Sequence, residues 1–357
     1  MRLSGRLLLA PVLLLPGCGG DEPNPFASQG SIAKLRPTSA LVFATDAWAD
    51  KPGPNLEIFA LDENGEGLLR LTRCNGETAC NNLEVSPAWD RKRLAIRRVD
   101  KDTNSDGLLT SADGETLIIG DVARGIEGEV TLRVQSTVGS TVTNHLNGLD
   151  WSPLEDIIVY GAAVANAPDD LFRSVPRPDT SGGETFALTT SSQLDERAPR
   201  VDPTGSVAVF ESVDAPDGRG SIAIFVSTTQ QPRITSGGAP GPALPGTPYV
   251  IGSDATPDYS ADGNRVVFRR LTGPGPDGRG SWSLYTVATD GGGLVPIVTG
   301  DVWRSAPDWG PKGILFAEAD TATGGTALVV VDANGGGRRV VARFAAGFKV
   351  ESPRWLP

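Results

Sequence analysis

The chain has 357 residues, including 44 glycines and 28 prolines, and a formal net charge of −11 at pH 7. Gly and Pro together make about a fifth of the residues, which suits many turns and few helices and stays below the range typical of disorder. The acidic balance disfavours nucleic acid and anionic lipid surfaces as partners. Beyond the first twenty residues no stretch shows sustained helical periodicity, so we expect one large β domain.

The N-terminal segment indicates export. Arg2 and Arg6 flank the start of an apolar run over residues 7–15, which is too short to span a bilayer and is typical of a secretory leader. The run ends in Leu15-Pro16-Gly17-Cys18, which resembles the bacterial lipobox, although Pro16 replaces a residue that is usually small. The resemblance implies that Cys18 receives a diacylglycerol and becomes the mature N-terminus. The alternative is an ordinary leader with an incidental cysteine.

A tether is predicted over residues 18–37, between the leader at 1–17 and a folded domain at 38–357. The tether is rich in Gly, Pro and polar residues, which is typical of flexible linkers. Multiple acyl chains on Cys18 would anchor the protein stably to the cell envelope. By resemblance to lipoprotein sorting signals, Gly19 favours the outer membrane, so we expect the domain to face the periplasm or the exterior. Removal of the leader leaves 30 basic and 43 acidic residues, a formal net charge of −13.

Three aliphatic runs at 40–43, 56–59 and 68–71 are predicted strands. Cys74 and Cys80 follow them in a loop. Because an exported protein meets an oxidising compartment, we predict a disulfide between these two cysteines. The alternative, a redox-active pair, would be expected to show the tighter CxxC spacing.

Residues 102–113 match the twelve-residue calcium loop. Side-chain oxygens stand at its first, third and fifth positions, glycine at the sixth and a carboxylate at the twelfth. The last ligand is Asp where EF-hands usually have Glu, and predicted strands flank the loop, so the resemblance is to the calcium loop alone. The alternative is a solvated hairpin tip, since Asp, Asn and Gly also favour turns. We predict a structural Ca²⁺ bound by the side chains of Asp102, Asn104, Asp106, Thr110 and Asp113 and by the carbonyl of Leu108.

A short phrase with an aromatic anchor position recurs through the rest of the chain. Successive anchors are separated by 62, 50, 58, 50 and 46 residues. After each of the first five copies come a turn and a β-branched or aliphatic run, and further strands complete the repeat, so we expect four-stranded sheets. The copies are Pro87-Ala-Trp89, Leu149-Asp-Trp151, Pro199-Arg-Val201, Pro257-Asp-Tyr259, Pro307-Asp-Trp309 and Pro353-Arg-Trp355.

The two ends of the chain complement each other. The phrase at Trp355 has no sheet after it, and the first three predicted strands have no phrase ahead of them. If the last strand completes the first sheet, a ring of six closes and both exposed sheet edges disappear. We therefore predict an all-β, six-bladed β-propeller of four-stranded antiparallel blades. The phrase resembles the Pro-x-Trp-Ser-Pro-Asp-Gly repeat of TolB-like six-bladed propellers, and the resemblance covers roughly residues 38–357.

Motifs for catalysis are sparse. The chain has one histidine, His145, and lacks a nucleophile elbow, zinc-ligand spacing and a phosphate loop. We therefore expect a monomeric, envelope-anchored scaffold that binds a protein or peptide, with Trp48, Trp282 and Trp303 as aromatic anchors on one rim. The main alternative is a glycan-directed binder, hydrolase or lyase that uses carboxylates at the central channel. A further alternative is a structural surface lipoprotein without a fixed ligand.

Overall fold

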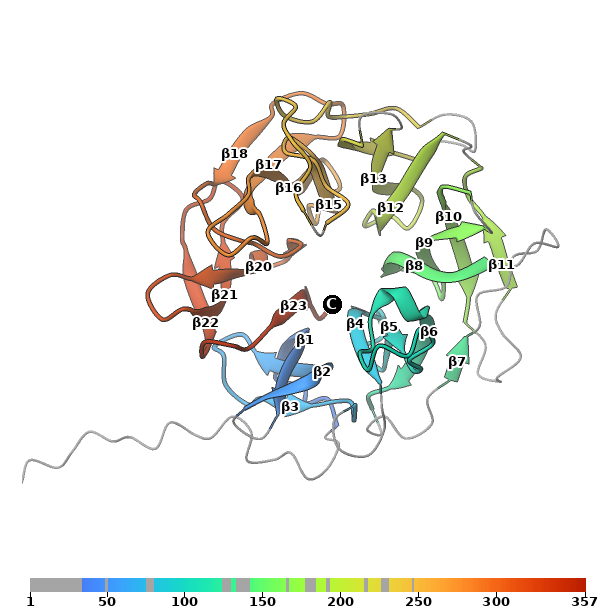
Figure 1. Ribbon diagram of the computed structural model, residues 1–357, viewed down its shortest axis with the longest axis vertical. Coiled ribbons are helices and arrows are strands. Elements are labelled where there is room, and N and C mark those ends of the chain that lie inside the picture. The colour runs from blue at the N-terminus through green and yellow to red at the C-terminus, as the bar shows by residue number, and fades with distance from the viewer. Residues whose placement is uncertain are drawn as a thin grey trace, which may run out of the picture.

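The computed structural model describes residues 34–48, 51–74, 80–123, 130–132, 142–164, 167–176, 184–190, 193–214, 218–225, 231–245 and 247–357. Their strands form six small antiparallel sheets arranged in a ring (Figure 1). The predicted all-β, six-bladed propeller is therefore confirmed. Among the described residues the only helix is the 3-10 turn η1 (Ser111–Asp113), and none is long and apolar enough to cross a membrane. The leader, Cys18 and most of the tether lie outside these residues.

The blades follow one another in chain order around the ring. The first contains β23 (Val350–Trp355), β1 (Ser39–Trp48), β2 (Lys51–Asp62) and β3 (Leu69–Arg70). The second contains β4 (Asn81–Pro87), β5 (Arg93–Val99), β6 (Thr116–Asp121) and β7 (Val130–Leu132). The third contains β8 (Val142–Trp151), β9 (Ile158–Val164), β10 (Asp169–Val175) and β11 (Glu184–Ala187).

The remaining three blades complete the circle. The fourth contains β12 (Leu194–Val201), β13 (Ala208–Asp214) and β14 (Gly220–Ile224). The fifth contains β15 (Asp254–Tyr259), β16 (Arg265–Gly273), β17 (Ser281–Ala288) and β18 (Val295–Val298). The sixth contains β19 (Asp308–Gly310), β20 (Gly313–Asp320), β21 (Gly325–Val331) and β22 (Arg339–Phe344).

The fourth blade differs from the expected four strands. Its described part has three, and β14 continues outwards only through an isolated bridge between Ala223 and Arg233. The segment after β14 contains Pro232, Pro240, Pro242 and Pro245, and proline cannot donate to a sheet ladder. This composition accounts for the missing regular strand.

The C-terminal strand closes the ring as predicted. β23 pairs antiparallel with β1, with Leu41 opposite Trp355 and Thr45 opposite Val350. The C-terminus consequently lies beside the central axis, where Figure 1 marks it. One strand of each blade contacts the corresponding strand of the next blade, so these six strands form the inner wall of the ring. They are β4, β8, β12, β15, β19 and β23.

The anchor of the last repeat shows how neighbouring blades fit together. Trp355 is 6% exposed, and its indole N–H donates to the carbonyl of Gly313 in the sixth blade at 3.0 Å. A Cβ on Gly310 would lie 2.2 Å from Cδ1 of Trp355. Only glycine therefore allows the sixth blade to approach this indole, which explains why Gly310 occupies the usual serine position of the repeat.

Candidate functional site

The residue just before each anchor determines what lies at the axis of the ring. In five of the six repeats this residue is charged: Asp150, Arg200, Asp258, Asp308 and Arg354. These residues come from five different blades, yet they surround the same central space. The spacing of the anchors was visible in the sequence, but the role of the charged residues before them was not.

Arg354 connects three blades across the axis. Its guanidinium is 4% exposed and forms ion pairs with Asp150 of the third blade and, at 2.9 Å, with Asp308 of the sixth. Each carboxylate also accepts a hydrogen bond from the backbone N–H of the next anchor. Val201 donates to Asp150 at 2.8 Å, and Trp355 donates to Asp308 at 2.6 Å. Side chains of the repeated phrase thus hold neighbouring blades together and fill the centre of the ring.

A second layer of ion pairs lies beside the first. Arg200 contacts Glu84 at 3.4 Å, and Arg97 contacts the other oxygen of Glu84 at 3.3 Å and Glu115 at 3.1 Å. Glu84 therefore forms ion pairs with two guanidinium groups, one through each of its carboxylate oxygens. Buried charges are tolerated when they are paired and hydrogen-bonded in this way.

Two carboxyl groups of the central network, Asp258 and Asp308, have altered acidity. Burial, together with the neighbouring carboxylate of Asp308, raises the pKa of Asp258 to about 7. Burial also raises the pKa of Asp308. Burial by itself would lower the pKa of Arg354, but Asp150 and Asp308 hold that pKa above its ordinary value. Asp258 therefore exchanges a proton near neutral pH, and its titration is linked to that of Asp308.

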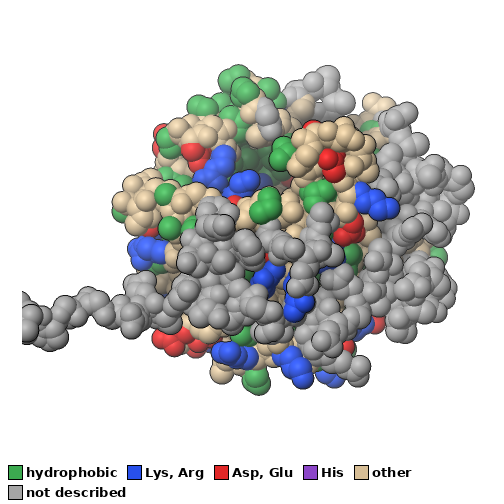
Figure 2. Space-filling model, turned by 60° about the horizontal axis from the view of Figure 1, so that its bottom comes forward, with side chains coloured by type: hydrophobic (Ala, Val, Ile, Leu, Met, Phe, Trp, Pro, Cys, Tyr) green, Lys and Arg blue, Asp and Glu red, His purple; other side chains and the backbone are tan. Residues whose placement is uncertain are grey.

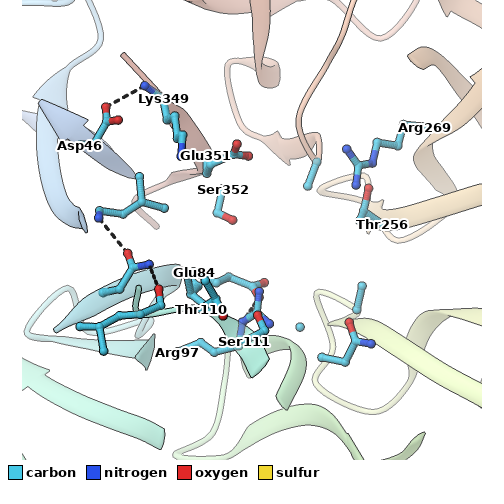
Figure 3. Close-up of a pocket in the computed structure, with 18 of the residues that line it drawn as sticks. Asp46, Glu84, Arg97, Thr110, Ser111, Thr256, Arg269, Lys349, Glu351 and Ser352 are labelled. Carbon is cyan, nitrogen blue, oxygen red and sulfur yellow. Dashed lines mark hydrogen bonds and ion pairs between the residues drawn. The ribbon is translucent and has the colours of Figure 1, made fainter. Parts of the chain in front are cut away.

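A cavity of about 470 Å³ opens at one mouth of the ring (Figure 3). The loops between β5 and β6 and between β23 and the sixth blade reach this mouth through Thr110 and Lys349. Its wall is polar and carries both charge signs. The charged lining residues are Asp46, Glu84, Arg97, Arg200, Arg269, Lys349 and Glu351.

Backbone strain is concentrated at this cavity. Ala198, Thr256 and Ser352 have φ of 46°, 49° and 46°, and all three stand three residues before an anchor. Gly148, at the same repeat position, has φ of 80°, and a Cβ there would lie 2.4 Å from Cα of Ala198. All four residues line the cavity. Left-handed non-glycine residues are costly and cluster where structure serves binding or catalysis, which marks this mouth as the candidate functional site.

One wall of the cavity carries a guanidinium stacked on aromatic rings. Arg269 and Thr256 lie across the cavity from Glu351 and Ser352 (Figure 3). Cζ of Arg269 lies 4.1 Å from the centroid of the Trp282 ring, and one Nη donates to the carbonyl of Arg304 at 3.0 Å. The cation–π contact and the hydrogen bond fix the guanidinium in place.

The prediction that Trp282 and Trp303 are exposed rim anchors is wrong. Their side chains are 2% and 6% exposed, because they pack into the core formed by the first, fifth and sixth blades. Each instead supports an arginine, since Cζ of Arg279 lies 4.3 Å from the ring centroid of Trp303. The side chains of Trp48 and His145 lie outside the described residues.

The opposite wall contains carboxyl groups with altered acidity. Burial raises the pKa of Glu351 to about 7, although Arg269 opposes the shift. Burial also raises the pKa of Asp46, whose carboxylate accepts the backbone N–H of Lys349 at 2.7 Å. Glu351 can therefore exchange a proton near neutral pH within the cavity.

The predicted calcium loop lies at the rim of the same cavity. Leu109, Thr110 and Ser111 line it, and the amide of Asn81 donates to the carbonyl of Leu109 at 2.6 Å. Leu109 packs inward and is 9% exposed, whereas Leu108 is 61% exposed. The loop is thus fixed to the second blade and presented at the mouth.

The loop brings three of its predicted ligands together. Carboxylate oxygens of Asp102, Asp106 and Asp113 lie within 4.8 Å of one another. Loop N–H groups also bind these carboxylates, for example Gly107 to Asp102 at 2.9 Å, and the N–H of Thr110 lowers the pKa of Asp113. Asn104 accepts the N–H of Asp106 at 2.9 Å. Hard oxygen donors converging in this manner suit Ca²⁺.

The remaining features of the ring are structural. Cys74 and Cys80 form the predicted disulfide, with an S–S distance of 2.02 Å. A second cavity of about 290 Å³ lies at the other mouth and is lined by all six repeat anchors. Trp151, Tyr259 and Trp355 are buried there, whereas Trp89 is 48% exposed. Figure 2 shows acidic, basic and hydrophobic side chains intermingled on the described part of one side of the molecule.

Solved structures with a similar fold agree with the propeller repeat found in the sequence. TolB from Acinetobacter baumannii has a TM-score of 0.62 at 15% identity, over 90% of this chain and 67% of that one. A putative TolB from Agrobacterium tumefaciens has a TM-score of 0.56 at 14% identity, over 90% and 99%. A chain of a nidogen/laminin complex has a TM-score of 0.57 at 10% identity, over 89% and 98%. No protein-family model and no curated protein matches the sequence. The fold is thus that of a TolB-like six-bladed propeller.

Asp258→Asn should reduce the pH dependence of stability between about pH 4 and 7, without abolishing it, because other buried carboxyl groups also have raised pKa values. Between its ordinary value of 3.8 and about 7, Asp258 keeps a proton in the folded state that the unfolded chain has lost. Stability therefore falls as pH rises through this window, by up to about 1.4 kcal/mol per pH unit. Urea unfolding at a series of pH values measures the slope.

A matched control lies in the same blade. A hydrogen bond from Ser260 lowers the pKa of Asp262 to about 2, so Asp262→Asn should leave the slope above about pH 5 unchanged. An equal slope in the parent chain and in Asp258→Asn would contradict the assignment of the titrating group.

Proposed function

We propose that the protein is a binding scaffold of the cell envelope and recognises a protein or peptide at the mouth lined by Thr256 and Ser352. The observation that carries this proposal is the combination of a central ion-pair network with a strained, polar cavity of about 470 Å³ directly beside it. Because Arg354 and its partners fill the centre, a ligand meets the ring at its mouth. The likeness to TolB and to a chain of the nidogen/laminin complex supports a propeller that binds proteins.

A glycan-directed enzyme is the second candidate. The observation that favours it is Glu351, whose pKa of about 7 suits a general acid or base. Glu351 lines the same cavity as Glu84. Two-carboxylate glycoside chemistry needs a second carboxyl group free to act. Glu84 is already held by Arg97 and Arg200, and Asp46 accepts the backbone N–H of Lys349, so the scaffold is the better-supported function.

We also propose that Ca²⁺ binds residues 102–113 and orders the rim of the binding mouth. Asp102, Asp106 and Asp113 would supply carboxylate oxygens, and Asn104, Thr110 and the Leu108 carbonyl are further candidate ligands. Support comes from the convergence of the three carboxylates and from the attachment of the loop to Asn81. The role of the ion would be structural, since it would fix Thr110 and Ser111 against the cavity.

Envelope anchoring completes the proposal. The lipobox-like sequence at Cys18 supports lipidation, and Gly19 supports the outer membrane as the destination. The domain begins at β1, and the disulfide suits an oxidising compartment. The binding mouth would then serve a partner in the periplasm or outside the cell.

Photocrosslinking in the producing cells tests this function. A photoreactive residue in place of Ser111, on the cavity rim, should capture a discrete protein adduct. The same residue in place of Leu294, which is 45% exposed on the fifth blade, is the matched control and should capture none. The adduct should sediment with membranes, and Cys18→Ser should release it.

Three results would contradict the proposals. Equal adducts from both positions, or none from the rim, would refute recognition at this mouth. An adduct that glycosidases remove would favour the glycan-directed alternative. A Cys18→Ser chain that still sediments with membranes would refute lipid anchoring while leaving recognition intact.

Calcium should raise the stability of the protein. Saturation at about one hundred times the dissociation constant adds about 2.7 kcal/mol to the native state. Thermal unfolding with and without Ca²⁺ measures the shift, which Asp102→Ala with Asp106→Ala should abolish. Asp290→Ala with Asp332→Ala, at turns of the fifth and sixth blades, is the control and should retain it. No calcium-dependent shift in the parent chain would refute the site.

A further inference from the structure

Two arginines near the mouth rest on buried tryptophans. Arg269 stacks on Trp282 at 4.1 Å, and Arg279 stacks on Trp303 at 4.3 Å. Tyr249 flanks Arg269 on another side, with 5.9 Å between its ring centroid and Cζ. Tryptophan faces attract cations and restrict their motion, so both guanidinium groups are organised before any ligand arrives.

Arg269 differs from the other guanidinium groups of the cavity wall. Arg97 and Arg200 form ion pairs with Glu84, whereas no carboxylate of the described residues lies within ion-pair distance of Arg269. The guanidinium faces the cavity, where Figure 3 shows it opposite Glu351. A partly buried cation without a direct ion pair favours the arrival of an anion.

The carboxyl groups around Arg269 do not take that role. Burial raises the pKa of both Glu211 and Glu351 to about 7, so each is partly protonated at neutral pH. Glu211 is fully buried, and one of its oxygens has no hydrogen-bond partner. Neither carboxyl group forms a direct ion pair with Arg269, so a group from outside the chain can approach its guanidinium from the cavity.

Two further cations border the same wall. Arg279 pairs with Asp277 at 2.7 Å, but both side chains are substantially exposed, at 41% and 34%, so this pair can exchange for another at little cost. Lys349 is exposed and lines the cavity. Both influence Glu351 electrostatically, which places them near the same part of the mouth as Arg269.

We propose that Arg269, with Arg279 and Lys349 at its border, binds a carboxylate of an acidic segment of the partner protein. This inference rests on the proposed scaffold function and adds the chemistry of recognition to it. A guanidinium fixed by stacking matches the planar, bidentate geometry of a carboxylate. The net charge of −11 repels an acidic partner at long range, so recognition depends on direct contact within the cavity. The buried Trp282 and Trp303 therefore position the binding groups without touching the partner.

Fluorescence anisotropy with a labelled peptide of alternating Glu and Gly tests the proposal. The parent chain should bind this probe and should bind its Gln counterpart at least about tenfold more weakly. Arg269→Gln should weaken binding of the Glu probe by about tenfold or more, and Lys349→Gln by a smaller factor. Arg265→Gln is the matched control, since Arg265 lies on the same strand and bonds to Thr286 and Gly293 instead.

Several results would overturn the inference. Equal binding of the Glu and Gln probes, or unchanged binding in Arg269→Gln, would exclude a carboxylate site. Binding of an oligouronide in place of the Glu probe would assign the site to an acidic glycan. If Arg269→Gln does not fold, unchanged binding in the exposed Lys349→Gln variant would refute the site. A rim adduct at Ser111 that survives in Arg269→Gln would leave the scaffold function standing while this inference fails.

Discussion

The ion pairs of Arg354 with Asp150 and Asp308 are the interaction on which the ring depends. Arg354 belongs to the last strand, and its two partners belong to the third and sixth blades. Closure through β23 therefore joins the two ends of the chain and also places a charge at the axis. Breaking such a buried pair by removing one partner leaves uncompensated charge, so these residues constrain one another.

Filling of the axis directs function to the mouths of the ring. At one mouth the six repeat anchors line the cavity, and half of them are buried framework. At the other, strained residues such as Thr256 and Ser352 surround a polar cavity, and the loop 102–113 reaches its rim. The inner strands thus hold the ring together on one side and line the candidate binding cavity on the other.

The fold could be predicted from the sequence because the anchors recur at nearly regular spacing and the two ends are complementary. The disulfide of Cys74 and Cys80 was also predictable from export. The charged network was not, because Asp150, Asp308 and Arg354 come from distant repeats and only the closed ring brings them together. Trp282 and Trp303 were misassigned for a related reason, since only the closed ring brings the first, fifth and sixth blades together around them. The cavity wall at Arg269 and Glu351 likewise depends on contacts between blades.

Replacement of Arg354 by Met, followed by urea unfolding, tests most directly whether the central ion pairs hold the ring together. We expect a loss of about 3–5 kcal/mol in the free energy of unfolding, because Asp150 and Asp308 would remain buried without their cation. Arg343→Met, which removes an arginine that is 58% exposed and pairs with Asp320, should cost less than about 1 kcal/mol. Equal, small losses in the two variants would show that the ring closes independently of Arg354 and would contradict its central role.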